Sequence, residues 1–243
     1  MSTAKAILTP APGAKFEKGE VPRRALGPEM VAIDIKFSGI CHSDIHQARD
    51  EWFEGTYPMV PGHEIVGLVT AVGDNVSKFT VGDRVGVGTF VDSCRTCEPC
   101  STGNENFCRT GNVQTYNGHH YDGEPSYGGY ANAIVVDQNY VLRVPENLDF
   151  AASAPLLCAG VTVYTPLKHW KAGPGMRVGV MGLGVPGVRT ETGQRPMLDP
   201  ARQEWRVHAA SRLALRAVKV SPVSASIASW PVKDCHRSMA TST

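Results

Sequence analysis

The chain has 243 residues, of which 42% are hydrophobic, and a formal net charge of +1 at pH 7. This composition supports a buried core and excludes nucleic acid or another polyanion as the main partner. No stretch of about 18 apolar residues is present, so no membrane span is expected. Residues 1–10 lack a basic segment followed by a long apolar run, which predicts no secretory signal and a cytoplasmic protein. In that compartment the seven cysteines are expected to be metal ligands or free thiols before disulfides.

Charge is distributed unevenly along the chain. Residues 1–187 contain 15 Lys and Arg against 19 Asp and Glu, a net charge of −4. Residues 188–243 contain 9 against 4, a net charge of +5, and seven of those nine basic residues are Arg. A change of composition this sharp predicts a boundary near residue 187.

Short strand patterns dominate residues 31–144, between turns rich in Gly and Asp. The predicted strands are Val31–Phe37, Ile65–Val72, Arg84–Phe90, Tyr130–Val136 and Tyr140–Val144. Strands this short and this closely spaced favour a small β barrel or sandwich. Between Cys94 and Gly129 the periodicity is lost, and a loop of that length needs something to hold it in place.

A helical pattern begins after residue 150. Residues 151–171 predict a helix with Gly160 as a weak point, and the Gly-Pro-Gly at 173–175 ends it. Met176–Met181 then predicts a short buried strand. The chain therefore changes from a β-rich to an α/β pattern here.

Gly182, Gly184 and Gly187 form a G-x-G-x-x-G pattern directly after that strand. Such glycines allow a tight turn and the close approach of a dinucleotide pyrophosphate to a helix N-terminus. The helix that should follow is interrupted by Gly193 and Pro196. The pattern therefore indicates only the beginning of a dinucleotide-binding fold.

Four cysteines with short spacings form what we call the quartet: Cys94, Cys97, Cys100 and Cys108. Spacings of two residues let neighbouring thiolates reach one tetrahedral ion, with Zn–S distances of about 2.3 Å. Two disulfides or four free thiols are the alternatives. The spacing favours zinc, and a site closed by four thiolates has a structural role.

A second group, which we call the open site, comprises Cys41, His63 and Cys158. These residues are far apart in sequence, so spacing alone does not assign them. Glu64 follows His63 and is well placed as a partner carboxylate in the second shell of a metal. Ser43 and His46 follow Cys41, and a hydroxyl and an imidazole in series are what a proton relay requires.

Several motifs occur together and in a characteristic order: GICHSD, VPGHE, GDRV, the quartet and PLLCAG. With these motifs, residues 1–187 resemble the zinc-dependent medium-chain alcohol dehydrogenases, and in particular the cinnamyl-alcohol-dehydrogenase-like, NADP-dependent subgroup. The resemblance implies a β-rich, GroES-like barrel as catalytic domain over 1–150, with the loop 94–108 stapled by zinc. It implies that 151–187 supply a linking helix and the first strand and glycine loop of an incomplete Rossmann domain.

The resemblance also implies roles for single residues. Cys41, His63 and Cys158 would bind a catalytic zinc ion beside Glu64, and the quartet would bind a structural one. Ser43 would take the proton of the alcohol and His46 would pass it on. Trp52 either lines the substrate pocket or packs within a loop. The residues implied to hold the pyrophosphate of NADP(H) are Gly182, Gly184 and Gly187.

The partner implied for the site is a small alcohol or aldehyde, and members of the family are usually homodimers. After Gly187 the resemblance ends, which predicts that 188–243 form an unrelated, irregular and disordered tail without the dimer segment. A frameshift, an error in the gene model or a recombination event would explain such a tail. Two functions remain open: an alcohol–aldehyde oxidoreductase, and a non-catalytic zinc-binding remnant of one.

Overall fold

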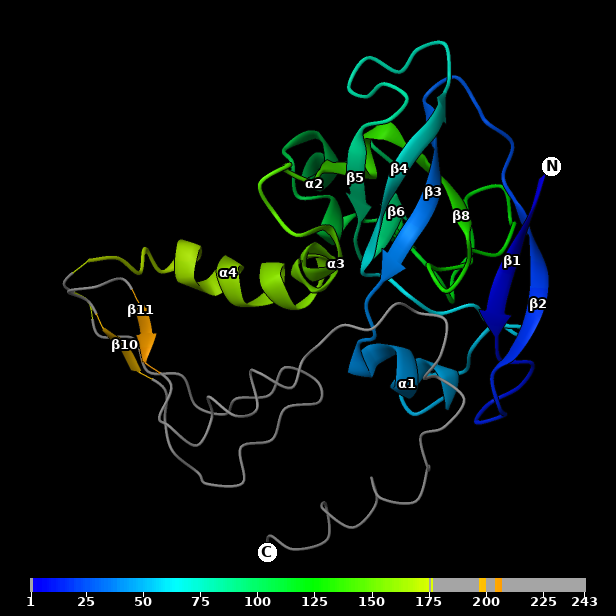
Figure 1. The fold of residues 1–243 in the computed structure, drawn as a ribbon, viewed down its shortest axis with the longest axis horizontal. Coiled ribbons are helices and arrows are strands. Elements are labelled where there is room, and N and C mark those ends of the chain that lie inside the picture. Colours follow the sequence, from blue (N-terminus) through cyan, green and yellow to red (C-terminus); the bar gives the residue numbers. More distant parts are fainter. Residues whose placement is uncertain (1, 175, 177–196, 200–203, 207–243) are drawn as a thin grey trace, which may run out of the picture.

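The computed structural model describes residues 2–174, Met176, 197–199 and 204–206 (Figure 1). The predicted strand Met176–Met181 lies outside the described residues except for Met176, and so do Gly182, Gly184 and Gly187. All of the predicted zinc ligands lie within the described residues.

The centre of the fold is a five-stranded antiparallel sheet in the order β8-β3-β4-β5-β9. Its strands are β3 (Met30–Ser38), β4 (Ile65–Val72), β5 (Arg84–Val87), β8 (Ala133–Asp137) and β9 (Leu142–Arg143). One face carries the main core, because every second residue of the strands points inward. Examples are Val31 and Ile33 on β3 and Val85 and Val87 on β5, all buried.

Five strands are predicted and each overlaps a strand of this sheet, but most of their boundaries differ. Ile65–Val72 is confirmed over its whole length. The predicted strand Arg84–Phe90 is instead two strands, because the chain leaves the central sheet after Val87 and β6 (Phe90–Asp92) pairs with β7 (Val113–Gln114). The strand predicted from Tyr130 begins at Ala133. Ahead of β9, residues Gln138–Tyr140 form a 3-10 turn, η2.

A hairpin at the N-terminus is absent from the predicted strands. β1 (Ser2–Leu8) pairs with β2 (Glu17–Arg23) in antiparallel register. Single bridges join it to the rest of the fold, from Ala6 to Ala131 and from Thr9 to Met59. Small alanines fill the inward positions of β1 and Pro22 lies within β2, so the strand pattern is weak in sequence.

The helices are short and lie outside the central sheet. α1 (His42–Ala48) follows β3, whereas α2 (Glu98–Ser101) and the 3-10 turn η1 (Glu105–Phe107) lie in the quartet loop. The predicted continuous helix over 151–171 is wrong in one respect. It is divided into α3 (Phe150–Ser153), the 3-10 turn η3 (Ala154–Leu157) and α4 (Ala159–His169). The break falls at Cys158, two residues before the predicted weak point.

Helix α4 extends away from the sheets (Figure 1), and none of its residues is buried. Its apolar side chains Val161, Val163 and Tyr164 are exposed, as is Trp170 just beyond it. The tail predicted over 188–243 lies outside the described residues except for β10 (Met197–Asp199) and β11 (Glu204–Arg206), which pair with each other. Among the described residues no single helix is long and apolar enough to cross a membrane, although the bent pair Phe150–Leu157 and Ala159–His169 passes by length and composition.

Candidate metal centres

The open site is assembled from three separate segments of the chain. Cys41 immediately precedes α1, His63 immediately precedes Glu64 and β4, and Cys158 occupies the break between η3 and α4. One ligand atom from each of these four residues lies within 4.8 Å of all the others. Cys41, His63 and Glu64 are buried and Cys158 is half-buried. The structure therefore brings together the three predicted ligands and adds the Glu64 carboxylate to them.

The donor set fits a zinc ion. The sulfurs of Cys41 and Cys158 are 3.8 Å apart. Two thiolates on a tetrahedral zinc ion, with Zn–S bonds of about 2.3 Å, are separated by about 3.8 Å. Two sulfurs and one imidazole fill three positions of a tetrahedral ion. The fourth position is open to an outside ligand when the nearby Glu64 carboxylate does not take it, which distinguishes this site from one closed by four thiolates.

Asp44 holds the open site together, although no role was predicted for it from the sequence. Its buried carboxylate accepts hydrogen bonds from the backbone N–H groups of Cys41, at 2.9 Å, and Gly62, at 3.1 Å. It also pairs with Nδ1 of His63 at 3.0 Å and accepts from the Tyr130 hydroxyl at 2.9 Å. Bonding at Nδ1 leaves Nε2 of His63 to face a metal.

Glu64 is predicted as a carboxylate in the second shell of the metal, and its oxygen lies within 4.8 Å of the ligand atoms of Cys41, His63 and Cys158. The hydrogen bond to Nδ1 of His63 is made by Asp44. Asp44 reaches the open site because α1 begins directly after Cys41. Asp44 is the third residue of α1, where a carboxylate reaches back to the N-cap backbone and so lies over the ligand Cys41. The spacing of Cys41 and Asp44 was the sequence signal that could have identified it.

The segment that carries His63 has a constrained backbone. Gly62 has φ of +103°, and a Cβ atom there would lie 2.7 Å from the ring of Tyr130. A residue with a side chain would therefore be strained and would also displace Tyr130 from Asp44. On the other side of His63, the ring of Tyr116 stacks at a centroid distance of 5.8 Å.

The electrostatics of the open site show an excess of negative charge. A hydrogen bond from Cys158, with others from His63 and Ser43, outweighs burial and lowers the pKa of the Cys41 thiol to about 4. Burial and then the charge of Cys41 raise the pKa of Glu64 to about 7. Burial opposes protonation of His63, but its bonds to Asp44 and Cys41 prevail and raise its pKa to about 10. A dication would stabilise the ionised thiols and carboxylate and compete with the proton on His63.

The predicted relay residues lie on α1 beside the ligands. The Ser43 hydroxyl is 3.4 Å from Sγ of Cys41. His46, one turn further on, pairs through Nδ1 with Glu51, and its ring stacks on Trp52 at 4.9 Å. No hydrogen bond joins Ser43 to His46 within the described residues. Trp52 is 53% exposed, so it is stacked on His46 and open to solvent rather than packed in a core.

The quartet is also assembled, with its four sulfur atoms within 4.8 Å of one another. Sγ of Cys100 lies 3.4 Å from that of Cys97 and 3.9 Å from that of Cys94. Backbone N–H groups point at the sulfurs, from Cys97 to Cys94 at 3.4 Å and from Arg109 to Cys97 at 3.5 Å. Such bonds favour thiolates, and those from residues 96 and 97 lower the pKa of Cys94 to about 5. These distances fit one tetrahedral ion with four sulfur ligands.

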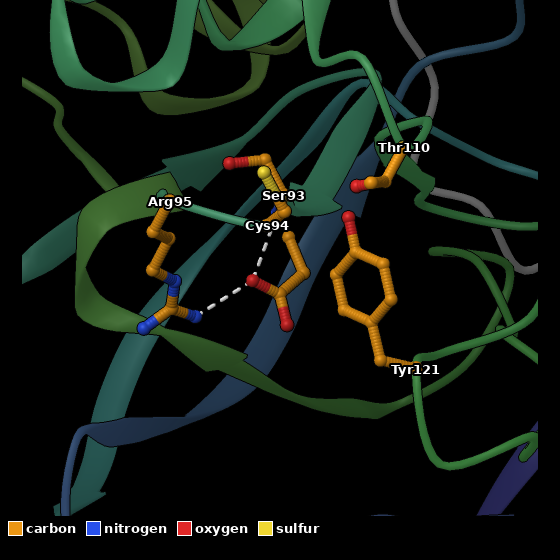
Figure 2. Close-up of a pocket in the computed structure, with 6 residues that line it drawn as sticks. Ser93, Cys94, Arg95, Thr110 and Tyr121 are labelled. Carbon is orange, nitrogen blue, oxygen red and sulfur yellow. Dashed lines mark hydrogen bonds and ion pairs between the residues drawn. The ribbon is translucent and has the colours of Figure 1, made fainter. Parts of the chain in front are cut away.

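A groove of about 480 Å³ lies beside the quartet and is lined by Asp92, Ser93, Cys94, Arg95, Thr110 and Tyr121 (Figure 2). The Arg95 guanidinium, labelled in Figure 2, donates to the Asp92 carboxylate at 2.7 Å. Arg95 also pairs with the buried Asp137, at 3.0 Å, which ties the start of the loop to β8. The groove shares no lining residue with the open site.

Comparisons with known proteins agree with this geometry. A family model for the alcohol dehydrogenase GroES-like domain matches residues 27–146. The chain is 57% identical over 185 residues to NADP-dependent alcohol dehydrogenase C 1 of Mycolicibacterium smegmatis, covering 76% of this chain and 53% of that protein. The structure of cinnamyl alcohol dehydrogenase from Helicobacter pylori complexed with NADP(H) superposes with a TM-score of 0.72 at 49% identity. That likeness covers 75% of this chain and 53% of the other.

The sheets and the two cysteine sites therefore define a GroES-like domain of the alcohol dehydrogenase kind. More particularly, the chain belongs to the zinc-dependent medium-chain alcohol dehydrogenase family, of the cinnamyl alcohol dehydrogenase type. A Sorghum bicolor cinnamyl alcohol dehydrogenase is likewise similar, with a TM-score of 0.73 and 48% identity over 76% of this chain. The chain spans about half the length of the relatives that it matches.

Proposed function

We propose that this chain provides the zinc-binding catalytic domain of an NADP(H)-dependent oxidoreductase that interconverts primary alcohols and aldehydes. The observation that carries the proposal is the convergence of Cys41, His63 and Cys158 on one point, with the two sulfurs 3.8 Å apart. In this proposal the substrate oxygen takes the fourth position on the metal. The printed names of the relatives, which include NADP-dependent alcohol dehydrogenases, support the cofactor and the substrate class.

Each residue of the open site would have a distinct role in this reaction. Zinc, when bound, polarises the substrate oxygen, and NADP(H), when bound, carries the hydride. Cys41, His63 and Cys158 hold the metal, and Asp44 fixes which nitrogen His63 presents to it. Ser43 takes the hydroxyl proton.

The proton then reaches solvent through His46. The ring of His46 contacts Glu51 through Nδ1 and stacks on Trp52. As part of the proposal, Trp52 lines the substrate side of the site. The Ser43–His46 relay and the pyrophosphate site at Gly182, Gly184 and Gly187 are part of the proposal, as are the domain limits at 150 and 187.

A second candidate is a zinc-binding protein without turnover. The observation that favours it is α4, whose Val161, Val163 and Tyr164 are exposed. An apolar helix face is normally covered by a packed element, and no sheet covers it among the described residues. This candidate keeps both metal sites and predicts no dinucleotide binding.

Zinc analysis and NADPH titration separate the two candidates. We expect two zinc ions per chain in the purified 243-residue protein for either candidate. Saturable NADPH binding, followed by fluorescence, together with zinc-dependent oxidation of a primary alcohol, would support the oxidoreductase. Two bound zinc ions without NADPH binding would instead establish the second candidate, and one zinc ion would place metal in the quartet alone.

A further inference from the structure

Arg23, the last residue of β2, is a buried cation that pairs with no carboxylate among the described residues. It is 6% exposed. Its Nη1 donates to the carbonyl of Tyr127, and its Nη2 donates to that of Gly128 at 2.8 Å. Nε has no partner among the described residues, and none of the ion pairs there includes Arg23. Burial lowers its pKa to about 10, so the guanidinium is charged at neutral pH and its charge is costly where it lies.

The next residue adds a second positive charge. Arg24 pairs with Asp122 at 2.7 Å, but its Nε also has no partner in the described structure. Nearby, burial and then the charge of Arg24 lower the pKa of His120 to about 4, so this imidazole is neutral at pH 7 and offers an N–H donor. Two guanidinium groups are therefore balanced by one carboxylate, and Asp122 is itself half exposed.

Arg23, Arg24 and His120 line one cavity of about 30 Å³, whose other walls include the apolar Val91 and Ile134. A single water molecule needs about 10–15 Å³ of such space, so the cavity holds one particle of that size or slightly larger. A monatomic anion fits, whereas a phosphate or a carboxylic acid does not. The lining offers N–H donors and positive charge, which suits an anion better than a water molecule.

We propose that this cavity binds one halide ion, chloride under ordinary conditions, which neutralises Arg23. The site is separate from both cysteine sites but is connected to the open site through the chain. Arg23 fixes the carbonyls of residues 127 and 128, and Gly128 and Gly129 donate to the carbonyls of Val60 and Gly62. Tyr130 then bonds to Asp44. The ion thus stabilises the segment on which the orientation of His63 depends.

The test compares halide with a bulky anion at constant ionic strength. Replacing sodium gluconate by sodium chloride or bromide is expected to raise the unfolding midpoint of the full 243-residue chain by about 3 °C, with saturation. The chloride NMR line is expected to broaden in its presence, because bound chloride relaxes fast. Arg24→Gln, at a partly exposed position, should abolish both effects and still fold.

Two further variants make the result decisive. Arg23→Lys keeps the buried charge but removes Nε, and it should weaken halide binding at least tenfold. Arg143→Gln removes an exposed arginine of similar charge that pairs with Asp83, and it should leave the halide response unchanged. If the wild-type protein and Arg24→Gln respond equally to halide, the proposal is wrong and the cavity contains water only.

Discussion

The quartet and the open site could each hold a metal ion, but the quartet ligands are close together in the sequence and the open-site ligands are far apart. The quartet takes all its sulfurs from residues 94–108, a stretch with only the short helices α2 and η1. The open site takes its ligands from three elements, and Cys41 and Cys158 are 117 positions apart. Ligands that are close in the sequence need only a turn to bring them together. Ligands that are far apart meet only when the whole sheet has formed. We therefore expect a bound metal to order the loop in the first case, and the fold to create the site in the second.

The largest expected effect concerns the quartet. Cys100→Ser should remove one of two zinc ions and lower the unfolding midpoint by about 10 °C or more, because the loop has little core of its own. Metal analysis and thermal unfolding would measure this. The open site should keep its zinc, since none of its ligands comes from the loop. Loss of both ions would show that the two sites are not independent. Cys235→Ser, which changes the one cysteine that is not among the predicted zinc ligands, is the control.

Asp44→Asn tests whether the open site depends on the orientation of His63. The amide keeps the shape but loses the charge and one pair of acceptors, so zinc affinity there should fall about 10- to 100-fold. Competition with a chelator of known affinity would measure it. Asp50→Asn is a matched control, because Asp50 accepts from Gly55 and Tyr57 and contacts no metal ligand. An unchanged affinity in Asp44→Asn would contradict the role given to this carboxylate.

The raised pKa of Glu64 predicts that the stability of the metal-free protein depends on pH. Its pKa is raised to about 7 in the folded state, so its favourable contribution is present below the unfolded value of about 4.5 and is lost as pH rises through 7. Glu64→Gln should therefore gain stability relative to wild type between pH 5 and pH 7.5, by about 3 °C in midpoint. Parallel unfolding curves for the two proteins across that range would exclude this effect. The quartet contains no such carboxylate, so Cys100→Ser should not alter the difference.

The smallest effect is expected from Tyr130→Phe. It removes one of four hydrogen bonds to Asp44 and leaves the ring that packs on Gly62. The expected cost is about 1 kcal/mol of unfolding free energy, with a few-fold loss of zinc affinity at the open site. Chemical denaturation and the same chelator competition would measure both. Tyr121→Phe removes a hydroxyl that bonds to the carbonyl of Gly111, three residues after the quartet, and should leave open-site affinity unchanged.

The same contrast explains what could be predicted from sequence. The quartet follows from its spacing alone, and β4 from its run of apolar residues. The three distant ligands could be grouped only by resemblance, because no periodicity connects Cys41 with Cys158. Asp44 received no role because its contacts to residues 62, 63 and 130 arise only in the folded chain. The helix break at Cys158 was misplaced for a similar reason: Gly160 is the weaker helix former, but packing of Leu157 against the sheet decides the position.

Asp44 has a further consequence for dynamics. The same carboxylate that accepts from the N–H of Cys41 at the beginning of α1 also holds His63, so the first turn of this helix cannot open without releasing His63, a proposed metal ligand. Local opening of α1 and loss of the metal should then be one cooperative event. Amide hydrogen exchange in residues 42–45 would slow when zinc is added, and the helix would report on occupancy of a site to which it contributes no ligand of its own.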